Sequence, residues 1–456
     1  MNNTLYKKLL KNCDKILIKL GQRKYIYYLS SIFVTKYNIN NKSNVFFKER
    51  LFNFIRSIKS YIFYIIHENN SYYSKSSIFN KKYDIIFISN KISQNKKEFY
   101  KDQYFGKIRE KLLKKKLEIL IIYRNFTSTS SKYLFGRFNL KKNEILLSKT
   151  ESVYKELIFF IIAIKEFLII RFIIFFGIIK FDKNFISYLS LSKFLSICSN
   201  LRQVNQIKEI IKKCNPRSVV ITWEGHAWER ALISELKKEI KLNTAGYQFT
   251  PVNNSHNSMF KIYKKYYNPD YILTSGKILT NYFIKKKFKK EKILTLGSVK
   301  YKNYKIKKLS PKKKIILVCP EGLISETEIM LKKISVVSKN NPDYQFIFRF
   351  HPIMTKVEIK KILKKNKIKF NKKIQISFDE LKNDIKKSNY VCYRNSAVVF
   401  EAAKAGLIPI YLDIRNEVNV NPLFFDRTIF YSINEFSNLN LVMKKNINFK
   451  NLNNIN

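Results

Sequence analysis

Thr222–Arg230 reads Thr-Trp-Glu-Gly-His-Ala-Trp-Glu-Arg, and it combines residue types that are scarce elsewhere in the chain. Both tryptophans lie in it, together with one of only four histidines and one of only ten glycines. The preceding residues, Arg217–Ile221, form a short apolar run typical of a buried strand, and Ala227–Ile240 has the apolar spacing of a helix. A strand, a glycine-containing loop and a helix in this order predict one unit of a parallel α/β sheet. Ligands of open α/β sheets bind outside the carboxyl ends of the strands, so this loop is the first candidate for a functional site.

Strand-like runs recur on both sides of this segment and alternate with helical patterns, as in doubly wound parallel sheets. The earlier series comprises Asp84–Ser89, Leu117–Tyr123, Thr244–Phe249, Tyr271–Thr274 and Ile293–Leu296. The lysine-rich, glycine-free stretch Lys300–Lys314 reads as a linker. The later series comprises Lys314–Cys319, Tyr344–Phe350, Ile374–Ser377, Tyr390–Tyr393 and Ile408–Leu412. We therefore predict a helical N-terminal extension over residues 1–80 and two Rossmann-like domains over residues 81–305 and 306–456.

The formal net charge of the chain is +55, with 88 lysines and arginines against 33 acidic residues. The positive charge is mostly lysine and is spread along the whole chain, which is unlike the focused basic patch of a nucleic-acid-binding protein. We therefore expect no nucleic-acid partner. An anionic membrane surface fits dispersed lysines better, since each lysine near such a surface contributes roughly 1 kcal/mol of binding. The five cysteines have no metal-binding spacing, and their odd number argues against a disulfide framework, so we expect free thiols in a reducing cytoplasm.

Leu157–Ile179 is almost wholly apolar and long enough to span a bilayer, but it contains Lys165, Glu166 and Arg171. Each such charge near the bilayer centre costs about 2.5–3.5 kcal/mol. These costs favour a helix that is buried in the fold or lies in a membrane interface over one that spans the membrane. The first 24 residues lack the uninterrupted apolar region of a signal peptide. We expect a cytoplasmic protein that can lie on the inner face of the cell membrane.

Glu224 and His226 are the first candidate catalytic residues. The apolar face of the predicted helix packs inward and directs its N-terminus, with free amide groups and partial positive charge, at the loop that carries them. A carboxylate at the tip of a strand is well placed to act as a general base. The alternative interpretation is that Glu224 only interacts with the helix end and that His226 is a structural hydrogen-bond donor.

The segment from Tyr247 to His256 is a second candidate site, because a polar loop follows the end of a predicted strand there. Gln248, Asn253 and His256 could hydrogen-bond the hydroxyl groups of an acceptor molecule. The alternative is an ordinary polar surface loop.

Arg349-Phe350-His351-Pro352 is a third candidate. A strand delivers the histidine to its own carboxyl end, and the proline ends the strand. An imidazole or a guanidinium group at such a position can donate to a phosphate.

A fourth candidate runs from Arg394 to Gly406. A strand leads into Asn395-Ser396-Ala397 and then into a helix, and a hydroxyl group with free amides at a helix N-terminus can bind an anion. Glu401 lies one turn into the helix and could accept hydrogen bonds from a ribose. The alternative is a plain helix cap with Glu401 solvated.

The order of these motifs resembles that of the GT-B glycosyltransferases, in the branch that contains bacterial sialyltransferases, polysialyltransferases, capsule transferases and CDP-glycerol glycerophosphotransferases. An acid-glycine motif, a His-Pro motif and a serine-bearing turn carry the resemblance, as Glu224-Gly225, His351-Pro352 and Asn395-Ser396. More narrowly, Glu224–Ile233, Asn268–Leu273 and Leu296–Ser298 look like a surface carbohydrate biosynthesis family. Two positions depart from the pattern, since Trp223-Glu224 stands where two acids are usual and Ser396-Ala397 stands where two serines are usual.

The resemblance implies a metal-independent glycosyltransferase without a cofactor that builds a surface polysaccharide such as a capsule, O-antigen or lipopolysaccharide. Glu224 would deprotonate the acceptor, bound to the first Rossmann-like domain, while the second domain would bind a nucleotide-sugar, with CMP among the candidate nucleotides. His351 and Ser396 would contact the donor phosphate, with Glu401 near the ribose. The other residues expected to bind the donor are Arg349, Pro352, Asn395 and Ala397. The alternatives are a CDP-glycerol-type polyol-phosphate transferase, a GT-B nucleotide-sugar epimerase and a non-catalytic glycan-assembly protein of the same fold.

Overall fold

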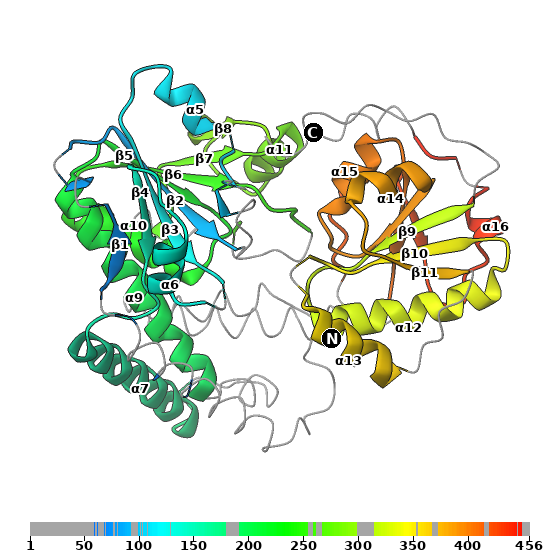
Figure 1. The fold of residues 1–456 in the computed structure, drawn as a ribbon, viewed down its shortest axis with the longest axis horizontal. Coiled ribbons are helices and arrows are strands. Elements are labelled where there is room, and N and C mark those ends of the chain that lie inside the picture. The colour runs from blue at the N-terminus through cyan, green and yellow to red at the C-terminus, as the bar shows by residue number, and fades with distance from the viewer. Residues whose placement is uncertain are drawn as a thin grey trace.

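The computed structural model describes most of residues 70–448 and a few isolated positions before them. The longer gaps are residues 93–98, 179–190, 254–258, 261–266, 299–313, 367–372 and 415–418. Nearly all of the predicted N-terminal extension, His256 and the predicted domain boundary at 305/306 lie outside the described residues. The described elements form two α/β units, each built around its own sheet (Figure 1).

The first unit contains a sheet of eight described strands. Its strands are β1 (Tyr72–Ser74), β2 (Ile85–Lys91), β3 (Ile119–Asn125), β4 (Glu144–Leu147), β5 (Ser218–Thr222), β6 (Asn243–Gln248), β7 (Tyr271–Thr274) and β8 (Ile293–Thr295). Its helices are α5 (Ile108–Leu113), α6 (Ser131–Arg137), α7 (Val153–Phe175), α9 (Leu191–Cys214), α10 (Ala227–Glu239) and α11 (Lys277–Lys285), with a 3-10 turn at Lys290–Lys292.

The strand order of the first sheet is β1-β4-β3-β2-β5-β6-β7-β8, and all neighbours are parallel except β1 and β4. From β2 the chain first builds outward through β3 and β4, and then returns to build the other half from β5. This is the Rossmann strand order, and the order reverses between β2 and β5. Alternate residues of β2 and β3 point to opposite faces, where they pack into two separate apolar clusters.

The second unit has a sheet of six described strands in the order β11-β10-β9-β12-β13-β14, all parallel. Its strands are β9 (Ile315–Cys319), β10 (Gln345–Arg349), β11 (Ile374–Ser377), β12 (Tyr390–Tyr393), β13 (Ile408–Leu412) and β14 (Tyr431–Ile433). Its helices are α12 (Ile324–Asn340), α13 (Lys356–Asn366), α14 (Leu381–Lys387), α15 (Val398–Lys404) and α16 (Leu439–Val442). This is again the Rossmann order, with its reversal between β9 and β12. The predicted fold class, two doubly wound α/β domains, is confirmed.

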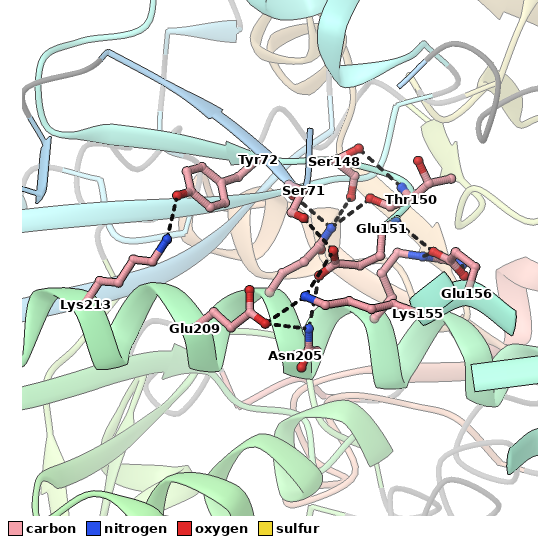
Figure 2. A network of polar contacts seen from close by, with 12 residues as sticks. Ser71, Tyr72, Ser148, Thr150, Glu151, Lys155, Glu156, Asn205, Glu209 and Lys213 are labelled. Atoms are coloured by element: carbon pink, nitrogen blue, oxygen red, sulfur yellow. Dashed lines mark hydrogen bonds and ion pairs between the residues drawn. The ribbon is translucent and has the colours of Figure 1, made fainter. Parts of the chain in front are cut away.

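The long apolar helix α7 packs along α9, and its buried residues Phe159, Ala163 and Ile170 join the same apolar cluster as residues of α9 and of the first sheet. A partly buried polar network joins the start of α7 to α9 and to the β1 edge (Figure 2). In this network Glu151 accepts from Asn205 at 3.2 Å, Lys155 pairs with Glu209 at 2.8 Å, and Arg202 Nη2 donates to Glu156 at 2.8 Å. These bonds fix the first turns of α7 against the body of the domain.

The apolar segment predicted over Leu157–Ile179 is therefore a helix that begins earlier, at Val153, and packs on the fold. Among the described residues, no helix has the length and apolarity needed to cross a membrane. The described cysteines, Cys198, Cys214, Cys319 and Cys392, are free thiols in buried positions.

Candidate functional site

Glu224 and His226 lie directly after β5, at the carboxyl edge of the first sheet. The Nε2 atom of His226 is 2.5 Å from Oε2 of Glu224, and both side chains keep some solvent exposure, 29% and 21% respectively. The loop between β5 and α10 turns at Gly225, whose φ of +74° lies in the left-handed region that glycine adopts without steric cost. The strand, the glycine turn and the helix thus present a carboxylate and an imidazole together, as the sequence predicted.

Glu229, in the first turn of α10, bonds the backbone of this loop. Its Oε2 atom accepts hydrogen bonds from the backbone N–H of Glu224 at 2.9 Å and of His226 at 2.8 Å. The side chain is 1% exposed, and burial raises the pKa of Glu229 to about 7. Glu229 thus bonds the N-cap amide of α10, at His226, and also the amide of Glu224 two residues before it.

His226 responds to two opposed influences. Burial lowers its pKa, but the hydrogen bond and negative charge of Glu224, together with the charge of Glu229, raise it by more. The pKa of His226 therefore lies above its ordinary value. The Glu224–His226 pair can hold a proton between its two members and pass it to or from a bound molecule.

Three further polar residues border this pair, and sequence analysis did not select them. Arg124, at the end of β3, lies 3.6 Å from the ring centroid of Trp228 and donates to Gln203 at 2.9 Å. Burial lowers its pKa to about 9, although the nearby charges of Glu229 and Glu224 act in the opposite direction. The other two residues are Tyr104 and Asn90 of β2, whose side chains share a hydrogen bond. Burial raises the pKa of Tyr104. Their position in the sequence could have indicated two of them, because Asn90 and Arg124 directly follow the predicted strands Asp84–Ser89 and Leu117–Tyr123, whose carboxyl ends lie at the same edge as Glu224.

The first site therefore surrounds the point where the strand order reverses, between β2 and β5. At such a switch point the loops from adjacent strands diverge to opposite faces of the sheet and leave a crevice that binds ligands. The second sheet has a polar cluster at its own switch point, between β9 and β12. There Asn395, after β12, donates from Nδ2 to Oε2 of Glu321, after β9, at 3.1 Å.

Asn253 connects the two units. Its Nδ2 atom donates to Oδ1 of Asn395 at 2.9 Å, and its side chain is only 3% exposed. A residue predicted for the acceptor side and a residue predicted for the donor side are thus in direct contact. Sequence spacing alone could not predict this contact, because the two residues are 142 positions apart.

Two of the predicted binding residues are engaged within their own domains. Gln248 is fully buried, donates to the carbonyl of Thr250 and accepts from Ser275 Oγ at 3.0 Å. Arg349 donates to Asp384 at 2.8 Å and thereby links β10 to α14. These bonds fix the ends of β6 and β10.

The remaining donor-side candidates lie at or near the carboxyl edge of the second sheet. His351 and Pro352 follow β10, and the carbonyl of His351 accepts from the amide of Met354 at 2.9 Å. Ser396 is 4% exposed, and the N-cap of α15 is Ala397 rather than Asn395 or Ser396. The expected side-chain cap is absent here because the Asn395 side chain bonds Glu321 and Asn253 instead. Glu401 lies on α15 and is 8% exposed.

A pocket of about 720 Å³ lies beside the Asn253–Asn395 contact and is lined by residues of both units. From the first unit come the residues that follow β6, the ends of β7 and β8, and α11. From the second come Phe400 and Lys404 of α15, together with Pro422, Phe424 and Phe425. Within the described part of the chain, no group of three or more histidines, cysteines or acids is arranged to hold a metal ion.

No family model and no curated protein matches this sequence. Similar solved structures include UDP-GlcNAc 2-epimerase from Methanocaldococcus jannaschii in complex with UDP-GlcNAc and UDP, at 14% identity over 81% of this chain and 98% of that one, with a TM-score of 0.47. MnaA of S. aureus with UDP is 11% identical over 82% of this chain and 86% of that one, with a TM-score of 0.47. The glycotransferase of kitacinnamycin is 7% identical over 82% of this chain and 94% of that one, with a TM-score of 0.45. The strand orders and the pocket shared by the two units place the chain in the GT-B fold class.

Proposed function

We propose that this protein is a GT-B glycosyltransferase that transfers a sugar from a nucleotide-sugar to an acceptor in surface polysaccharide biosynthesis. The observation that carries the proposal is the juxtaposition of two switch-point sites. The Glu224–His226 pair occupies the first site, Asn395 occupies the second, and Asn253 connects the two domains. Ligands of doubly wound domains bind at such positions.

In the proposed reaction, Glu224 accepts the proton of an acceptor hydroxyl group. At the same time the oxygen of that hydroxyl group attacks the anomeric carbon of the donor. The new glycosidic C–O bond forms as the bond between the sugar and the nucleotide phosphate breaks. The electron pair of the broken bond leaves with the phosphate. A carboxylate in hydrogen-bond reach of the hydroxyl group is the chemical requirement for this step.

The departing phosphate gains negative charge, which hydrogen-bond donors and cations must stabilise. In our proposal His351 and Ser396 donate hydrogen bonds to this phosphate. Both residues lie at the carboxyl edge of the second sheet, near Asn395. Glu401 lies one turn along α15 and accepts from the ribose.

We also propose that the enzyme works on the inner face of the cell membrane, with α7 as the contact. Leu157, Ile161, Leu168 and Phe172 recur along this helix at helical spacing and are each more than half exposed. The charged residue Arg171 is also exposed, whereas Glu166 is 4% exposed and directed inward. An apolar helix face with exposed cationic residues fits an anionic lipid surface.

Binding and turnover of activated sugars test the proposal. The protein is incubated with CMP-, CDP-, UDP- and GDP-linked sugars, and its thermal unfolding is followed. We expect one nucleotide class to raise the unfolding temperature, because a ligand that binds only the folded state stabilises it. If no nucleotide changes it, the glycosyltransferase proposal is wrong.

Product analysis separates the rival activities. An epimerase converts its nucleotide-sugar without an acceptor, and a polyol-phosphate transferase consumes CDP-glycerol. A non-catalytic assembly protein still restores surface glycan in a deletion strain when it carries both Glu224→Gln and His351→Ala.

A further inference from the structure

The pocket between the two units has a mainly apolar wall. Phe249 and Val252 follow β6, Tyr282 lies on α11, and Phe400 and Phe424 belong to the second unit. The rings of Tyr282 and Phe424 meet edge to face across the two units, with centroids 5.2 Å apart. A sugar or a phosphate gains little from such a wall, whereas a hydrocarbon gains about 25 cal/mol for each Å² that it removes from water.

All the charged side chains among the described lining residues are lysines: Lys277, Lys285 and Lys404. Lys277 opens α11 and Lys285 ends it, and both are exposed, whereas Lys404 on α15 is partly buried and burial lowers its pKa. No aspartate or glutamate is among the described residues of the lining. The N-terminus of α11 faces the same pocket through Gly276 and adds partial positive charge. An apolar wall with positive groups fits a molecule that has a hydrocarbon part and an anionic group.

The pocket also lies next to the residues proposed to act on the donor. Val252 in its wall precedes Asn253, whose side chain bonds Asn395. Phe400 and Lys404 lie on α15, the helix that follows Ser396. A molecule in this pocket therefore lies beside the proposed position of the donor phosphate.

We propose that this pocket binds the non-reacting part of the acceptor, and that the acceptor is an amphipathic anion in which a hydrocarbon chain and a phosphate group are joined to the part that carries the reacting hydroxyl group. This inference rests on the proposed function and adds the chemical class of the acceptor. The hydrocarbon packs against the aromatic wall, the phosphate is held by Lys277 and the first amides of α11, and Lys285 at the far end of the helix adds positive charge to the pocket.

Calorimetric titration of the full chain with decyl phosphate, decanol and inorganic phosphate tests the inference. Decyl phosphate is used below its aggregation concentration. We expect it to bind at least tenfold more tightly than either decanol or phosphate. If decanol binds as tightly as decyl phosphate, the lysines do not contribute to binding. If inorganic phosphate binds as tightly as decyl phosphate, the aromatic wall does not contribute. Either result, or no binding of decyl phosphate, overturns the inference.

Variants locate the site. Asn281 lines the pocket but is exposed, so Asn281→Trp fills the space without disturbing the core. We expect this variant and the double variant Lys277→Ala/Lys285→Ala each to weaken decyl phosphate binding at least tenfold. Lys339→Ala, an exposed lysine at the end of α12, is the matched control and should bind as the parent does. Unchanged binding in both pocket variants overturns the assignment.

Competition with nucleotides distinguishes the failure of this inference from the failure of the proposed function. If UDP or CMP displaces decyl phosphate, the pocket belongs to the donor and the inference fails. If nucleotide-sugars bind and react while decyl phosphate does not bind, only the inference fails. If decyl phosphate binds at the pocket and no nucleotide-sugar binds anywhere, the glycosyltransferase proposal fails instead.

Discussion

Asn253 donates a hydrogen bond from Nδ2 to Oδ1 of Asn395, 2.9 Å away, and Asn395 donates in turn to Glu321 at 3.1 Å. This chain of bonds crosses from the end of β6 in the first unit to the switch point of the second. It fixes the two carboxyl edges relative to each other at the position where donor and acceptor would meet.

Asn253→Ala should lower the free energy of unfolding by about 1–3 kcal/mol, because a buried donor is removed and the Asn395 oxygen loses a partner. Urea denaturation followed by fluorescence measures this change. Asn139→Ala, at an exposed position after α6, is the control and should lie within about 0.5 kcal/mol of the parent. An equal effect of the two substitutions would show that the contact does not join the units in solution.

Gly246→Ala should destabilise the first unit by about 1–3 kcal/mol, because the added methyl group has no space. Its Cβ would lie 2.9 Å from Cβ and Cγ of Trp223 and 3.0 Å from Cγ of Pro269. Trp223 adjoins Glu224, so activity should fall as well. Gly136→Ala on α6 is the matched control, since its Cβ meets nothing within 4 Å and should be neutral or stabilising. A neutral Gly246→Ala variant would contradict the packing at this position.

Glu229 should make stability depend on pH. Its pKa is raised from 4.5 to about 7 in the folded protein, so between these values the folded state binds more protons than the unfolded state. Stability therefore rises as pH falls from 7 to about 5, and the cost of the buried charge is fully present above pH 7. The difference is on the order of 3 kcal/mol.

Glu229→Gln should remove this part of the pH dependence while keeping an oxygen that can accept a backbone hydrogen bond. Urea denaturation at pH 5, 6, 7 and 8 gives the slope for parent and variant. Identical slopes would show that Glu229 keeps an ordinary pKa.

Glu224→Gln should lower kcat by about 10²–10⁴-fold, the usual contribution of a general base, without weakening donor binding. Glu239→Gln at the end of α10, where Glu239 pairs with Lys208 and Lys212, is the control and should retain activity. Glu224→Gln should also lower the pKa of His226, because it removes the negative charge that opposes the effect of burial. NMR titration of the histidines measures this shift. A fully active Glu224→Gln enzyme would exclude Glu224 as the base.

Phe172→Glu on α7 should reduce binding to vesicles that contain anionic lipid at least fivefold, because it places a negative charge on the exposed apolar face. Vesicle flotation measures bound protein. Val336→Glu replaces an exposed apolar residue on α12 and is the control. Equal binding of both variants and the parent would exclude α7 as the membrane contact.

Local sequence patterns predicted much of the fold. The helix expected over Ala227–Ile240 is α10, Ala227–Glu239, because its apolar spacing and the glycine before it act within a few residues. The strand predicted over Tyr390–Tyr393 has the predicted bounds. Short strands such as β1 and β14, with three residues each, were not predicted, because pairing with a neighbouring strand stabilises them rather than their own pattern.

The sequence by itself determined that the chain builds two parallel α/β sheets and places Glu224, His226, His351 and Asn395 after strands, since strand and helix periodicity are local properties. Only the tertiary structure decided which of these side chains meet and which are engaged elsewhere. Arg349 pairs with Asp384, Gln248 bonds Ser275, and Asn253 reaches Asn395. Glu229 came to hold the Glu224 loop because α10 buries its first turn against the sheet. Such choices depend on burial and on partners far apart in the chain, which no local pattern contains.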